Sequence, residues 1–275
     1  MCRGPFFLFE SLLIHCDCYQ VYNTRSNNPS RRSKNSDISW RYRICVLYKI
    51  NDRLALKTPR IAGNDQFAYE LSIYNILEEY PIYPDISRSF LRVTNGNFMD
   101  FCNGGSLDQR LLKHQTRSEA GFEGYIIRVN KKEPLEIVER WIMELSNASA
   151  WLESLGYVHT DIRPANLLLD RDDHLKLTDF DCVNKIGSPA LGGAPPWCRL
   201  CGLEAGTESN TFGYNGPRVE QFAIGSVLYM MIRGYEPYDV EGGFNSKDGS
   251  IVKKLQLMDF PSLGEDPLDK IIDKC

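Results

Sequence analysis

The sequence contains no apolar run long enough to cross a membrane, no excess of positive charge and no even set of cysteines. Its nearest approach to a membrane or secretion signal is residues 6–14, a run that Glu10 interrupts. A bilayer-spanning helix needs about 20 apolar residues, and no small-residue cleavage site follows at residues 16–18. The net charge of −4 and the sequence pI of about 5.7 provide no overall basic field for a polyanion. We therefore expect a protein that neither enters a membrane nor binds nucleic acid.

The nine cysteines are scattered through segments that read as strands and loops. An odd count without a regular framework favours reduced thiols, so we expect an intracellular protein, in the cytoplasm or nucleus. Cys198 and Cys201 form one Cys-x-x-Cys, but no second pair of matching spacing completes a zinc site. A chain of 275 residues suits one bilobal domain, and we expect a monomer.

The stretch at residues 159–170 carries the clearest chemical signal. Asp161 and Asn166 stand five positions apart, with Pro164 restricting the chain between them, so a carboxylate and an amide can point into the same small volume. The alternating residues 174–178 predict a strand that delivers Asp179 to the same place. Such a set of oxygen atoms suits a base together with metal ligands.

These two stretches resemble, with substitutions, the H-R-D-L-x-x-x-N and D-F-G signatures of eukaryotic-type protein kinases. Their residues are most similar to those of kinase-like proteins from filamentous fungi. The resemblance implies an α+β, bilobal fold, with a small antiparallel β lobe at about residues 41–101 and a mostly helical large lobe at about 102–275. Residues 1–40 then form an N-terminal extension or linker, which we expect to be poorly ordered because residues 23–36 are mostly Asn, Ser, Arg, Lys and Pro.

The small lobe contains a predicted hairpin over residues 43–57 that ends in Ala-Leu-Lys. This end resembles the V-A-I-K strand of the family, in which Lys57 would reach the nucleotide phosphates. In the following segment Phe67 and Tyr74 recur at helical spacing, and Glu70 lies beside that apolar face. We expect Glu70 to pair with Lys57, and Glu78 or Glu79 are alternatives nearer the helix end.

Residues 90–93 and 97–101 predict two further strands joined by Asn-Gly. The segment from Met99 to Leu107 resembles the hinge of the family, where backbone groups bind the adenine edge. The resemblance makes Asp100 and Cys102 hinge positions and Met99 the gatekeeper.

In the large lobe, apolar residues recur at helical spacing over residues 135–155, and Gly156 ends the run. Residues 116–133 are polar and are predicted to be an extended connection. Residues 219–231 predict a buried helix, with Glu220 where the family usually has aspartate. The sequence ends at Cys275, about where the family continues through its last helices, so we expect a C-terminally short large lobe.

The resemblance also assigns roles. Asp161 would accept the proton of the acceptor hydroxyl, while Asn166 and Asp179 would hold Mg²⁺ on the phosphates of ATP. Lys57 would neutralise phosphate charge, and Arg163 takes the place of the catalytic-loop lysine. The implied activity is ATP- and Mg²⁺-dependent phosphoryl transfer to Ser or Thr hydroxyls of a protein substrate.

The chain departs from the family at the loop that covers the nucleotide. In register with the family's glycine-rich loop, the glycine positions fall on Trp40, Tyr42 and Cys45, and no glycine occurs between Gly4 and Gly63. Backbone amides approach phosphates closely only where no side chain intervenes, so this loop is degenerate, either absent or rebuilt.

Two further departures lie beside the signatures. Asp181 replaces the glycine of D-F-G. It could restrict the backbone rotation that glycine permits at this position, or coordinate a cation. Thr160 replaces the arginine that usually binds an activation-segment phosphate, so we expect no switch of that type. We expect His159 to be structural. Two alternatives to an active protein kinase therefore stay open. One is a pseudokinase that acts as a binding or scaffold domain, and the other is a small-molecule phosphotransferase of kinase-like fold.

Overall fold

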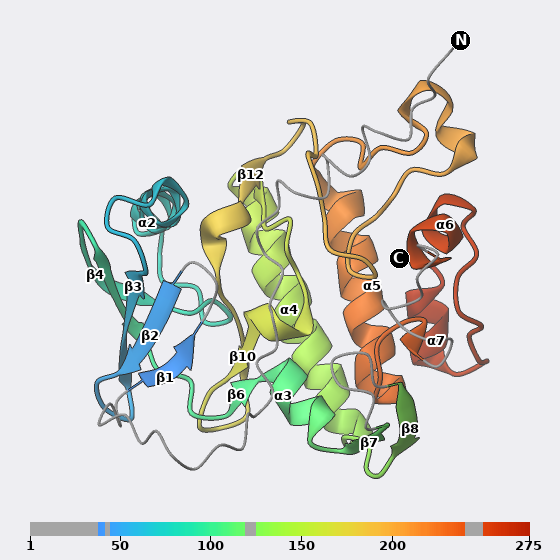
Figure 1. Ribbon diagram of the computed structural model, residues 1–275, viewed down its shortest axis with the longest axis horizontal. Coiled ribbons are helices and arrows are strands. Elements are labelled where there is room, and N and C mark those ends of the chain that lie inside the picture. Colours follow the sequence, from blue (N-terminus) through green and yellow to red (C-terminus); the bar gives the residue numbers. More distant parts are fainter. Residues whose placement is uncertain (1–37, 42–44, 119–124, 240–249) are drawn as a thin grey trace.

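The computed structural model describes residues 38–41, 45–118, 125–239 and 250–275 (Figure 1). A β-sheet with one helix forms one side of the molecule, and helices form most of the other side. This arrangement is the bilobal α+β fold expected from the sequence. The predicted N-terminal extension, residues 1–40, lies almost wholly outside the described residues and stays a prediction.

The smaller lobe is a five-stranded sheet with the order β1-β2-β3-β5-β4, in which all neighbours are antiparallel. Its strands are β1 (Ile38–Arg41), β2 (Cys45–Lys49), β3 (Leu54–Pro59), β4 (Ser89–Val93) and β5 (Gly96–Asp100). The predicted hairpin corresponds to β2 and β3, whose register pairs Leu47 with Lys57. The residues between β1 and β2, which include Tyr42, lie outside the described residues.

Helix α2 (Asp65–Leu77) completes the smaller lobe. The Asn64 side chain accepts a hydrogen bond from the Phe67 backbone N–H and so caps the first turn. The helix buries Phe67, Ile73 and Tyr74, and with them the carboxylate of Glu70. A charged group on the buried face of a helix requires a partner, and β3 provides it.

The larger lobe is organised around α4 (Leu135–Ser154), against which α5 (Pro217–Arg233) packs. Trp141, Leu145 and Leu152 of α4 are completely buried. Among the described residues, the other α-helices of this lobe are α3 (Leu107–Leu112), α6 (Ser250–Gln256) and α7 (Pro267–Ile272), and short 3-10 helices are η2 (Pro164–Asn166), η3 (Phe180–Cys182) and η4 (Leu203–Glu208). The short strands are β6 (Gly105–Ser106), β7 (Gln115–Arg117), β8 (Ile126–Val129), β9 (Tyr157–Val158), β10 (Leu167–Leu169), β11 (Leu175–Leu177) and β12 (Asn184–Lys185).

The segment at residues 116–133 is not only an extended connection, because β7 and β8 pair within it as antiparallel strands. Arg117 of β7 binds Asp239, which follows α5, with two hydrogen bonds of 2.7 and 2.9 Å. These contacts hold the strand pair against the segment that follows α5. Within the described part of the chain, no helix has the length and apolar character needed to cross a bilayer.

Candidate active site

The hairpin of β10 and β11 brings two predicted metal ligands together. Its register pairs Leu167 with Leu177, so Asn166 and Thr178 are neighbours at the open end. The Thr178 backbone N–H donates to the Asn166 carbonyl oxygen at 3.1 Å and continues the pairing beyond the strands. Asp179 follows directly. Asn166 and Asp179 therefore start from the same end of the hairpin, as the sequence predicted.

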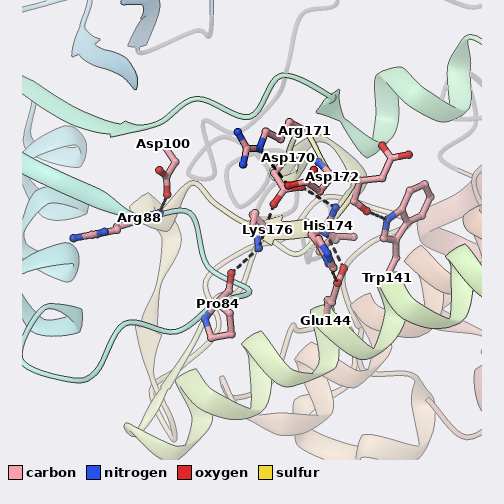
Figure 2. Close-up of polar contacts among 12 residues, drawn as sticks. Pro84, Arg88, Asp100, Trp141, Glu144, Asp170, Arg171, Asp172, His174 and Lys176 are labelled. Atoms are coloured by element: carbon pink, nitrogen blue, oxygen red, sulfur yellow. Dashed lines mark hydrogen bonds and ion pairs between the residues drawn. The ribbon is translucent and has the colours of Figure 1, made fainter. Parts of the chain in front are cut away.

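The opposite end of this hairpin is fixed to α4 (Figure 2). The Asp170 carboxylate accepts the His174 backbone N–H at 2.9 Å and shapes the turn. Nδ1 of His174 lies 2.5 Å from Oε1 of Glu144, and Nε1 of Trp141 donates to the Asp173 carbonyl oxygen at 2.7 Å. Both Trp141 and Glu144 belong to α4, so the longest helix of the lobe sets the position of the hairpin.

The catalytic-loop residues form one hydrogen-bonded group. Oδ2 of Asp161 accepts from Nε of Arg163 at 3.0 Å and from Nδ2 of Asn166 at 2.7 Å. Nδ2 of Asn166 also donates to the Asp161 carbonyl oxygen at 2.9 Å. All three residues are at most 9% exposed. The structure thus brings Asp161, Arg163 and Asn166 together, with a cation directly beside the candidate base.

Glu220 of α5 binds the backbone of this loop. Its carboxylate accepts the backbone N–H groups of His159 and Thr160, both at 3.0 Å. His159 lies 2.9 Å from the Thr178 carbonyl oxygen through Nε2, and Nδ1 accepts the Asp161 N–H at 3.3 Å. Burial lowers the pKa of His159 to about 4, so the ring is neutral near pH 7. The ring of His159 thus bonds backbone groups beside the catalytic loop, as expected of a structural histidine.

Lys57 connects the two lobes through two carboxylates. Its Nζ lies 2.7 Å from Glu70 and 2.6 Å from Oδ1 of Asp179. Lys57 is 6% exposed and Glu70 is fully buried. The predicted pairing of Lys57 with Glu70 is therefore present, and β3, α2 and the second residue after β11 meet at one ammonium group.

The ionisable side chains around Lys57 shift one another's pKa values. Although burial disfavours the Lys57 ammonium, Asp179 and Glu70 raise its pKa well above the usual value. Burial raises the pKa of Glu70, whereas for Asp179 the Lys57 ammonium outweighs burial and lowers the pKa. Burial, reinforced by the charge of Asp179, raises the pKa of Asp181 to about 8. Lys57 and Asp179 consequently form an ionised pair over the whole physiological range.

Phe180 fixes the backbone next to Asp179. Its ring is fully buried and meets Tyr74 of α2 edge-on, with ring centroids 5.1 Å apart. It also meets the His159 ring, with centroids 5.3 Å apart. Asp179 has a φ of 70°, in the left-handed region that few non-glycine residues adopt. Such a conformation persists only where the surroundings impose it, and the packing of Phe180 does so.

The oxygen atoms present suit a magnesium ion that is shared with phosphates. Asn166 and Asp179 offer an amide oxygen and a carboxylate, which are ligands that Mg²⁺ prefers. Both hydrogen bonds from Asn166 to Asp161 use Nδ2, so Oδ1 is the atom of this side chain that could bind a metal ion. Among the described residues, no group of three or more His, Cys, Asp or Glu could hold a metal ion alone. The residues therefore fit Mg²⁺ bound by one or two side chains and a nucleotide, rather than a closed protein site.

The predicted hinge residues lie where β5 ends. The Asp100 backbone N–H donates to the Arg88 carbonyl oxygen at 2.9 Å, and the Arg88 N–H donates to Oδ2 of Asp100 at 3.2 Å (Figure 2). Met99 and Cys102 are buried, at 4% and 8% exposed. Burial raises the pKa of the Cys102 thiol to about 12, so it is neutral. Any contact with a nucleotide base at Cys102 would use its backbone.

Of the three positions predicted for the glycine-rich loop, Trp40 of β1 and Cys45 of β2 lie within the described residues, and Cys45 faces the Lys57 group. Cys45 lies two residues from Leu47, which pairs with Lys57, so the side chains of all three are on one face of the sheet. Cys45 is 6% exposed, and burial raises its pKa to about 12. A buried thiol thus stands near Lys57, at a position to which the predicted register assigns a glycine of the family.

Four contacts near the site were not predicted. Nε2 of Gln66 donates to Oδ2 of Asp181 at 2.9 Å, and the Tyr69 hydroxyl donates to the Val183 carbonyl oxygen at 2.6 Å. The Thr160 hydroxyl donates to the Cys182 carbonyl oxygen, and Glu220 holds the catalytic loop as described above. The sequence signal for the contacts of α2 was helical spacing. Gln66 stands four positions before Glu70 and Tyr69 one position before it, so a helix places all three on the same side.

Comparison with known proteins identifies similar chains. A family model described as "Protein kinase domain" matches residues 66–272. The chain is 26% identical over 202 residues to CBL-interacting protein kinase 8 of Oryza sativa subsp. japonica, covering 70% of this chain and 39% of that protein. It is 30% identical over 145 residues to hormonally up-regulated neu tumor-associated kinase of Mus musculus, covering 52% and 18%. It is 25% identical over 202 residues to serine/threonine-protein kinase 32C of Mus musculus, covering 72% and 39%. The chain spans less than half the length of these relatives.

Proposed function

We propose, since the chain belongs to the protein kinase family, that it transfers the terminal phosphoryl group of ATP to serine or threonine hydroxyls of a protein. The observation that supports this most directly is the buried ion-pair chain of Glu70, Lys57 and Asp179. In protein kinases the lysine–glutamate pair and the metal-binding aspartate must both be in place for transfer. Here one ammonium group contacts both carboxylates.

Each residue of the site has its own role in the proposed reaction. Lys57 offsets the negative charge of the phosphates, and Asp161 accepts the proton of the attacking hydroxyl. Arg163, which contacts Asp161, would stabilise charge on the transferring group through its guanidinium. Asn166 and Asp179 would hold Mg²⁺, which supplies positive charge on the phosphates when it is bound. Asp100 and Cys102 would contact the adenine edge through their backbones. An enzyme of this kind works where ATP is abundant, so we also propose an intracellular location.

The first test is nucleotide binding, measured as thermal stabilisation by ATP with Mg²⁺. A ligand at 100 times its dissociation constant stabilises the native state by about 2.7 kcal/mol, which corresponds to a shift of roughly 5–10 °C for a chain of this size. We expect this shift for the wild type and its loss in Lys57→Ala, each compared with its own nucleotide-free melting temperature. ATP with a chelator is the control for the metal. Absence of any shift at millimolar ATP would contradict the proposal.

The second test is transfer itself, to a generic basic protein. Asp161→Asn should lower the rate by about 10²–10⁴, the usual contribution of a general base, while keeping the thermal shift. Transfer to an aminoglycoside or choline but not to protein would instead favour the small-molecule phosphotransferase.

One observation favours a second function. The buried thiol of Cys45 faces Lys57 where the family has a glycine that lets the backbone approach phosphates. A domain with an obstructed phosphate loop would act as a pseudokinase, a binding or scaffold domain. Cys45→Gly distinguishes the two functions: an ATP-dependent shift that appears only in this variant indicates a pseudokinase.

A further inference from the structure

The face of α2 that carries Glu70 carries two more polar side chains. Gln66, Tyr69 and Glu70 stand at positions i, i+3 and i+4, which a helix places on one side. That side packs against the turn at Phe180–Cys182. While Glu70 holds Lys57, the other two side chains reach the residues that follow Phe180.

Each of the three residues after Phe180 is held by a side chain from outside the segment. Oδ2 of Asp181 accepts from Nε2 of Gln66 at 2.9 Å. The Val183 carbonyl oxygen accepts from the Tyr69 hydroxyl at 2.6 Å. The carbonyl oxygen of the residue between them, Cys182, accepts from the Thr160 hydroxyl. The segment is thus bonded to α2 on one side and to the catalytic loop on the other.

Two of these bonds use the residues at which the chain departs from its family. Asp181 stands where a glycine would have no side chain to offer Gln66. Thr160 stands where an arginine would bind a phosphate on the activation segment, and it bonds the backbone of the same segment instead. The conformation of Thr160 agrees with a fixed role, because its φ is 63°, in a region that a β-branched residue rarely adopts.

We propose that Gln66, Tyr69 and Thr160 are positioning residues that hold residues 181–183 against α2 and the catalytic loop, so that Asp179 stays beside Lys57 without a phosphate on the segment. This inference rests on the proposed function, since it describes how the same site is kept assembled. The three hydrogen bonds to residues 181–183 would do here what the contact between a phosphate and an arginine does elsewhere in the family.

Hydrogen exchange of the nucleotide-free protein, followed by mass spectrometry over residues 180–185, tests the bonds without requiring activity. One net hydrogen bond corresponds to an opening equilibrium that changes by roughly two- to tenfold. We expect Gln66→Ala, Tyr69→Phe and Thr160→Val each to accelerate exchange by that factor. The triple variant should accelerate it by roughly ten- to a thousandfold. Ala68→Ser, at an exposed position of α2, is the control.

A rescue experiment separates a hydrogen bond from mere packing. Gln66→Leu removes the Nε2–H donor, so exchange should accelerate. Adding Asp181→Leu removes the acceptor as well, and should return exchange to within about twofold of the wild type, because replacing both partners by apolar groups is nearly neutral. A change in helix packing would not be reversed in this way.

The outcomes distinguish this inference from the proposed function. Faster exchange in the three variants supports the bonds even if the wild type transfers no phosphate. Unchanged exchange and unchanged turnover in the triple variant would overturn the inference while leaving phosphoryl transfer intact. Treatment of the wild type with a non-specific phosphatase should change neither exchange nor turnover, and a loss of either would also overturn it.

Discussion

The pH dependence of stability should change when Glu220 is replaced by glutamine. Burial raises the pKa of Glu220 from 4.5 to about 7, although its carboxylate accepts two backbone N–H groups. Between about pH 4.5 and 7 the folded state therefore retains a proton that the unfolded state releases. The contribution of this group to stability is complete below pH 4.5 and is lost as the pH rises through 7.

The size of the effect follows from the shift. A pKa raised from 4.5 to about 7 corresponds to about 3 kcal/mol, because one unit is 1.36 kcal/mol. Glutamine does not titrate. The free energy of unfolding of the wild type, minus that of Glu220→Gln, should therefore fall by about 3 kcal/mol across this window and stay constant on either side of it.

Urea unfolding at a series of pH values, followed by tryptophan fluorescence, measures this difference. The protein should be dilute, because the window spans the sequence pI of about 5.7. Glu139→Gln, at an exposed position of α4, is the control and should show no such trend. A difference that stays flat or rises with pH would mean that the carboxylate is ionised near neutrality, and that its two N–H bonds outweigh the cost of burial.

Two further predictions concern buried carboxylates of the large lobe. Arg117→Ala should destabilise the protein by about 3–5 kcal/mol in chemical unfolding, because Asp239 is 1% exposed and loses its bidentate partner. The control is Arg171→Ala, which removes an exposed ion pair and should cost about 1 kcal/mol or less. Equal effects of the two substitutions would refute the argument from burial. Glu144→Ala should cost about 2–4 kcal/mol, because it leaves the Leu175 N–H without its acceptor at 2.8 Å, and a change below about 0.5 kcal/mol would contradict this.

Those parts of the site that lie within one element, or in neighbouring strands, were predictable. Helical spacing placed Glu70 on the buried face of α2, and alternation placed Asp179 after a strand; Lys57 then contacts both. Period-based reasoning succeeds here because each side chain's direction is fixed by its own element. The roles assigned to Asp161, Arg163 and Asn166 stay predictions, although the three side chains are bonded to one another.

The contacts that were missed join residues far apart in the chain. Gln66 is 115 positions from Asp181, and Arg117 is 122 positions from Asp239. No local pattern encodes such pairs, since the path of the chain decides which polar side chains meet. The pairing of β7 with β8 was missed for a local reason: the strands are short, their register is irregular, and the alternation that marks a strand is weak.

The departures from the family differ in their physical consequence. At Thr160 and Asp181 the substituted side chain makes a hydrogen bond of its own, and at Glu220 the longer carboxylate still accepts both backbone N–H groups. These three substitutions therefore preserve the positions of the catalytic loop and of Asp179. Cys45 is different, because the register predicted from the sequence puts its buried side chain at a glycine position of the nucleotide loop, and no new bond can replace the space that a glycine would leave to phosphate. The chain should consequently differ from its relatives in how tightly it binds the nucleotide, rather than in how its catalytic groups are arranged.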